Sequence, residues 1–154
     1  MTGRHGAVGG NPFGACDVLV AAQRRSGIGV SIGRVIRQYA FMTRVEFGAS
    51  CVSACVYLLA AGQGRYVGGG VGIHRPRLLN DGVTSARTRQ AQYAGVQAQT
   101  RQYLEEMNLP ASLHNRMMRT PPDQVAWLTP HELTAFGLTK MIPPVPRPGS
   151  GVAR

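Results

Sequence analysis

Residues 51–61 constrain the fold of this chain most, because nearly every one of them is apolar or small. The run is shorter than the ~18 apolar residues that a membrane-spanning helix requires. Ala54, Ala60 and Ala61 allow neighbouring segments to approach closely, and Gly62 can cap the end of a helix. The segment therefore predicts a buried helix packed tightly on the elements around it.

Short strands and helices are expected on both sides of this segment. Helical patterns begin at Asp17, are interrupted at 26–29, and continue over 30–40, 84–107, 111–119 and 130–136. Strand patterns cover 42–47, 65–67, 71–74 and 138–142. This order predicts one α/β domain over residues 1–142. Residues 143–154 are rich in proline, glycine and arginine, which is typical of a disordered tail.

The composition fits a folded domain with a basic surface. The 154 residues are 44% hydrophobic, and 17 Lys and Arg against 7 Asp and Glu give a net charge of +10. Such a charge suits a nucleic-acid or membrane-surface partner. However, the arginines are scattered from Arg4 to Arg154, and aromatic residues make up only 6% of the chain. We therefore expect no nucleic-acid partner, and no motif for a metal or a small-molecule cofactor is apparent.

The residues with chemical potential lie at the start of the small-residue helix and about twenty positions later. Ser53 stands at the expected helix N-terminus, where unpaired backbone N–H groups favour developing negative charge. His74 ends a strand and could act as a base toward a serine on the adjacent helix. The alternative is structural: Ser53 would be a plain N-cap and His74 a hydrogen-bonded histidine at a strand end.

Three segments resemble the Clp protease proteolytic subunit and its bacterial relatives, namely 43–45, 51–62 and 71–76. The Cys-Val-Ser-Ala-Cys and Gly-Ile-His-Arg-Pro stretches are most similar to a Clp-like "predicted periplasmic protein" group. The resemblance runs from about Gly9 to Met141. It implies a ClpP/crotonase-like α/β domain and a serine peptidase-like hydrolase acting on peptide bonds, with Ser53 as nucleophile and His74 as general base.

The resemblance also implies an oxyanion hole. The family places one N–H donor at a glycine pair, here Gly9 and Gly10, and the other at the residue after the serine, here Ala54. The separation between the glycine pair and the helix at 29–37 is longer than in the family, which implies an insertion at roughly 16–28. The family also has strands before the glycine pair. This chain therefore either lacks those N-terminal strands or represents a truncated reading frame.

The third member of the family's catalytic triad departs from the pattern. Residues 127–138 resemble the family's C-terminal helix, and the triad aspartate would stand where this chain has Val125. Asp123 is the nearest carboxylate and could orient His74 only if the loop shifts. The alternative function is therefore a catalytically inactive Clp-like scaffold that binds peptides or protein partners. In either case the partner is a peptide or protein, and a homo-oligomer is an open possibility.

Three interpretations stay open for Cys51 and Cys55. They can form a disulfide that clamps the turn around Ser53, remain two small buried thiols, or bind zinc together with a histidine. A disulfide would leave Cys16 free and would require an oxidising compartment. The resemblance implies a periplasmic or membrane-associated location, although residues 1–10 show no signal peptide.

Overall fold

The computed structural model describes residues 26–77 and 85–141 of the chain. The helix expected from Asp17, the glycine pair Gly9 and Gly10, most of the insertion and the C-terminal tail lie outside the described residues. The described part is a mixed α/β structure. Its elements, in chain order, are α2 (Ser26–Gln38), β1 (Thr43–Val45), β2 (Ser50–Val52), α3 (Ala54–Ala61), β3 (Arg65–Val67), β4 (Gly70–Ile73), α4 (Ala86–Glu106), α5 (Ala111–Arg119), β5 (Ala126–Trp127) and α6 (Pro130–Ala135).

The strands form two small sheets. In the first, β1 and β3 run parallel. In the second, β4 lies in the centre, parallel to β2 on one side and antiparallel to β5 on the other. Both parallel pairs join the segment before α3 to the segment after it. The helix therefore acts as the crossover connection that a parallel pair of strands requires.

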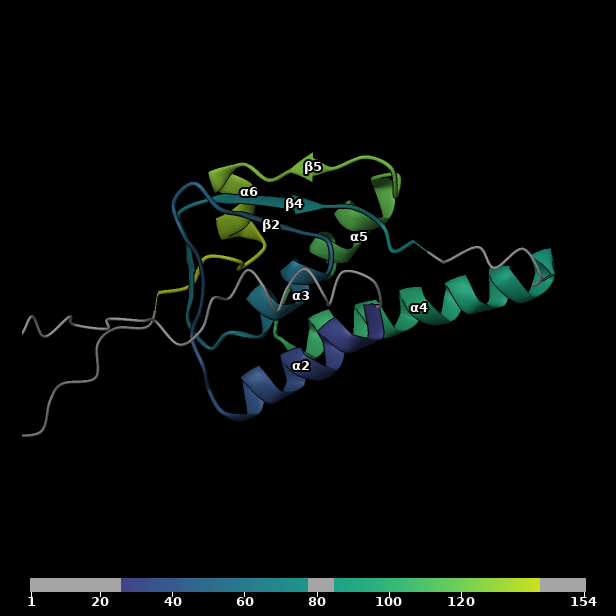
Figure 1. The fold of residues 1–154 in the computed structure, drawn as a ribbon, viewed down its shortest axis with the longest axis horizontal. Coiled ribbons are helices and arrows are strands. Elements are labelled where there is room, and N and C mark those ends of the chain that lie inside the picture. The colour runs from purple at the N-terminus through teal and green to yellow at the C-terminus, as the bar shows by residue number, and fades with distance from the viewer. Residues whose placement is uncertain (1–25, 78–84, 142–154) are drawn as a thin grey trace, which may run out of the picture.

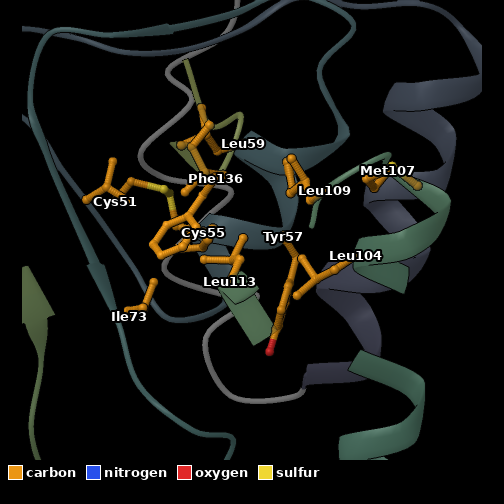
Figure 2. Close-up of a cluster of buried hydrophobic side chains, with 14 of the residues drawn as sticks. Cys51, Cys55, Tyr57, Leu59, Ile73, Leu104, Met107, Leu109, Leu113 and Phe136 are labelled. Atoms are coloured by element: carbon orange, nitrogen blue, oxygen red, sulfur yellow. A yellow bond between two sulfur atoms is a disulfide. The ribbon is translucent and has the colours of Figure 1, made fainter. Parts of the chain in front are cut away.

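Helix α3 is the centre of the structure, and all eight of its residues are buried. It lies between the three-stranded sheet and α2 (Figure 1). Side chains from every neighbouring element complete the core around it, and Figure 2 shows part of this cluster. The largest fully buried members outside α3 are Tyr103, Ile73, Leu104, Leu113, Met117 and Leu138.

The packing of α2 on α3 and α4 depends on two glycines. Gly29 faces Ala54 and Tyr57 of α3, and Gly33 lies directly against the hydroxyl group of Tyr103. That hydroxyl donates a 2.6 Å hydrogen bond to the carbonyl oxygen of Tyr57. The expected interruption at 26–29 is therefore wrong, because these residues form the first turn of α2. At Gly29 the absence of a side chain allows the close contact with α3.

One helix boundary and one strand also differ from the predictions. The small-residue helix begins at Ala54 instead of residue 51, because Ser50–Val52 form a strand that pairs with β4. The strand expected at 138–142 is reduced to one bridge between Lys140 and Arg65. Helix α5 and the capping box formed by Thr129 and Glu132 agree with the predictions.

A buried arginine, Arg65, connects the C-terminus of α4 to the segment that follows α6. Arg65 is only 3% exposed and donates hydrogen bonds to the carbonyl oxygens of Gly137 and Met107. Arg37 donates to the same Met107 oxygen at 2.8 Å. Met107 caps the C-terminus of α4, where the helix dipole favours positive charge. Burial and the nearby charge of Arg37 lower the pKa of Arg65 to about 10, so the group remains charged at neutral pH.

Helix α4 extends well beyond the packed body (Figure 1). Its buried residues, Thr100, Tyr103 and Leu104, all lie near its C-terminal end. Within the described residues, no helix has both the length and the apolar character needed to span a membrane.

The glycine crossing yields a stability prediction. Gly33→Ala should lower the free energy of unfolding by about 1–3 kcal/mol, the range for overpacking a filled core, because the new methyl group collides with the Tyr103 hydroxyl. Gly95→Ala is the matched control. Gly95 lies inside α4 with nothing near its Cβ position, so alanine there should add up to about 1 kcal/mol. Urea denaturation of the three proteins measures both effects, and equal stabilities would contradict the close crossing.

Candidate active site

Ser53 occupies a strained turn between β2 and α3. Its backbone has φ 61° and ψ −120°, a region that residues with a side chain rarely adopt. Although Ser53 is the N-cap residue of α3, its hydroxyl makes no capping hydrogen bond. This geometry disagrees with the plain N-cap interpretation and leaves the hydroxyl oxygen available for another role.

The first turn of α3 presents unused backbone donors beside this serine. Val56 N–H bonds to the carbonyl oxygen of Ser53, and Ser53 N–H bonds to the carbonyl oxygen of Gly72 at 3.3 Å. Within the described chain, no backbone acceptor pairs with the N–H of Ala54. This is the arrangement that a helix N-terminus offers to an anion. The other expected donor, Gly10, lies outside the described residues.

His74 follows β4 at the same edge of the sheet. Val52 is paired with Gly72 in the parallel register, so the residues after both strands emerge side by side. Neighbouring strands are about 4.8 Å apart, which puts the backbones of Ser53 and His74 on adjacent strand ends. In the part of the chain that the structure describes, no hydrogen bond joins the two side chains. Such bonds are often long before substrate binds, so the pair remains a candidate.

The imidazole of His74 is held by its own chain. Its Nδ1 atom lies 2.8 Å from the carbonyl oxygen of Arg75. The N–H of Arg75 in turn donates to the carbonyl oxygen of Thr120 at 3.0 Å. These contacts fix the histidine at the strand end.

The two residues considered for the third triad position lie in different surroundings. Ala126 is paired with Ile73, so Val125 falls opposite His74 in the antiparallel register. Its side chain meets those of Val52 and Trp127 above Gly72. Asp123 lies in the preceding turn, is exposed, and forms no hydrogen bond or ion pair with any described residue. The structure thus places Val125 beside His74, whereas Asp123 is exposed to solvent.

Cys51 and Cys55 are joined by a disulfide that brackets Ser53. Their Cα atoms are 5.2 Å apart, within the usual range for such a bond. Both cysteines are buried in the core cluster shown in Figure 2. Sulfur atoms in a disulfide are not thiolates, so this bonded form has no zinc ligands at these positions. Cys16 lies outside the described residues.

Two features of the site were missed in the sequence. One is the strand β5, whose Trp127 lies over Gly70 and Gly72 of β4. The other is the carbonyl oxygen of Arg75, since no side-chain pattern predicts a backbone acceptor. A signal did exist for the second: Pro76 follows Arg75, and a residue before proline is restricted to extended backbone.

Comparison with models of known protein families and with curated proteins finds no match for this chain.

The disulfide gives a prediction about the turn. Replacing Cys51 and Cys55 with alanine removes a disulfide that closes a very short loop. The loss of stability from chain entropy is therefore at most about 2 kcal/mol, and the melting temperature should fall modestly. The rate at which Ser53 reacts with a fluorophosphonate should fall more, because the N–H of Ala54 is no longer held in place. Cys16→Ala is the matched control and should change neither quantity.

Thiol counting under denaturing, non-reducing conditions checks the bond itself, and one free thiol is expected. Three free thiols in protein from an oxidising compartment would contradict the disulfide. A large drop in melting temperature with an unchanged labelling rate would assign the bond to the fold and not to the turn.

Proposed function

We propose that this chain is a serine peptidase-like hydrolase with a ClpP/crotonase-like domain, in which Ser53 is the nucleophile and His74 the general base. The observation that carries the proposal is the strained backbone of Ser53, whose hydroxyl forms no cap at the start of a buried helix. Strained residues of this kind concentrate at active sites, because the surrounding structure must hold them in place.

The chemistry assigns one task to each group. The Ser53 Oγ attacks the carbonyl carbon of the peptide bond while its proton passes to Nε2 of His74. The resulting oxyanion accepts a hydrogen bond from the N–H of Ala54, which lacks a backbone partner within the described residues. The C–N bond then breaks, the imidazolium gives its proton to the leaving amine, and an acyl ester remains on Ser53. Water hydrolyses this ester by the same steps.

The substrate proposed is a peptide or protein, by resemblance to the Clp family. The Cys51–Cys55 disulfide supports an oxidising compartment, where such bonds persist. The same resemblance supports assembly into a homo-oligomer.

A catalytically inactive scaffold that binds peptides is the second candidate. Val125, an apolar residue, lies opposite His74 where the resemblance calls for an aspartate. The two candidates differ in one measurable property, which is the nucleophilicity of Ser53.

Labelling by a fluorophosphonate probe tests the proposal. The wild-type chain should be labelled, Ser53→Ala should lose labelling completely, and His74→Ala should reduce its rate by about 10²–10⁴, the usual contribution of general base catalysis. Ser112→Ala, at an exposed position on α5, is the control serine and should react like the wild type.

Hydrolysis of a denatured protein substrate by the same variants then tests the bond specificity. An unlabelled but correctly folded wild type would favour the scaffold. Undiminished labelling of Ser53→Ala would overturn the assignment of the nucleophile.

A further inference from the structure

The contact between His74 and Arg75 determines which nitrogen of the imidazole carries the proton. Nδ1 lies 2.8 Å from the Arg75 carbonyl oxygen, and a carbonyl oxygen can only accept a hydrogen bond. We propose that this carbonyl orients His74 in place of a triad carboxylate: it holds the proton on Nδ1 and leaves the lone pair of Nε2 for the Ser53 hydroxyl.

The carbonyl is held from both sides. Pro76 is buried and restricts Arg75 to extended backbone, which fixes the direction of the peptide carbonyl. On the other side, the N–H of Arg75 donates to the Thr120 carbonyl oxygen. A hydrogen-bond acceptor that is fixed in advance does not need to reorganise when the imidazole becomes charged. Pro76 is therefore a positioning residue.

The surroundings of His74 make this acceptor necessary. The side chain of the register partner Val125 has no polar atom, and Asp123 is exposed without a partner among the described residues. A triad aspartate sets the histidine tautomer and steadies the imidazolium. The Arg75 carbonyl supplies the first effect in full. It supplies the second as a dipole instead of a full charge, so the pair works as a dyad.

The tautomer can be read directly by NMR. In two-bond ¹H–¹⁵N spectra of the full chain at a pH where the imidazole is neutral, protonated and unprotonated ring nitrogens have well-separated shifts. The His74 signals are assigned by their loss in His74→Gln. We expect a protonated Nδ1 and a bare Nε2. A proton on Nε2 as the main form would overturn the proposal, because a base with that tautomer cannot accept the serine proton.

Two variants separate the Arg75 carbonyl from Asp123. Asp123→Asn should leave both the tautomer and the fluorophosphonate labelling rate unchanged. If Asp123 were the orienting group, its rate would fall by as much as about 10⁴, as for a triad aspartate in a serine protease. Such a fall, or a change in the tautomer of Asp123→Asn, would overturn the proposal.

Pro76→Ala releases the restriction on Arg75. We expect a mixture of tautomers and a labelling rate about 10- to 100-fold lower, a smaller loss than the ~10²–10⁴ for removing the base, because His74 itself is kept. Pro110→Ala, at an exposed position before α5, is the matched control and should change neither. An unchanged tautomer in a folded Pro76→Ala would remove Pro76 from the proposal. If that variant does not fold, the wild-type spectrum and Asp123→Asn still decide.

The proposal rests on the proposed function for its catalytic consequence, but the tautomer does not depend on activity. A protonated Nδ1 in a chain that no fluorophosphonate labels would keep the assignment of the carbonyl and refute the hydrolase. A labelled chain with the proton on Nε2 would do the opposite.

Discussion

The complete burial of α3 is the constraint on which the rest of the structure depends. A helix with no solvated face must be covered on all sides, and eight residues, about 12 Å of helix, give very little surface to hold several neighbours. Its alanines allow close approach, and Gly29 of α2 faces Ala54 on one side. The strands before and after the helix cover another side by pairing with each other. The same parallel pairing brings the carboxyl ends of β2 and β4, and so Ser53 and His74, to one edge of the sheet.

The strained conformation of Ser53 follows from this arrangement. A strained residue persists only where its neighbours leave it no alternative. Here β2 is fixed by its pairing with β4, α3 is fixed by burial, and the Cys51–Cys55 disulfide connects the residues on either side of the turn. The hydrogen bond from Ser53 N–H to Gly72 ties the turn to β4 as well. Within this turn the strain falls on Ser53, whose hydroxyl forms no cap on the helix.

Features encoded by local patterns could be predicted from the sequence, and features that depend on tertiary contacts could not. The limits of α5 and the capping box at Thr129 come from local signals, so they agree with the structure. Local signals failed at Ser26–Gly29, which form a helical turn in which Gly29 packs against α3. Strand β5 was missed because two residues carry no periodicity, and its place depends on pairing with β4. Ser53 and His74 were found by motif, but no local pattern indicates the strain at Ser53, and Pro76 indicates only that Arg75 is extended, not that its carbonyl meets the imidazole.

The side chains around His74 leave its orientation to an uncharged acceptor. Val125, Val52 and Trp127 meet above Gly72, next to the histidine. Val125 is 41% exposed and Trp127 is 54% exposed, so these apolar side chains lie at the surface beside the histidine. A peptide carbonyl carries no net charge, so it stabilises the imidazolium less than a carboxylate would. The placement of Ser53 in a strained turn at the N-terminus of α3 therefore has to contribute more of the rate acceleration.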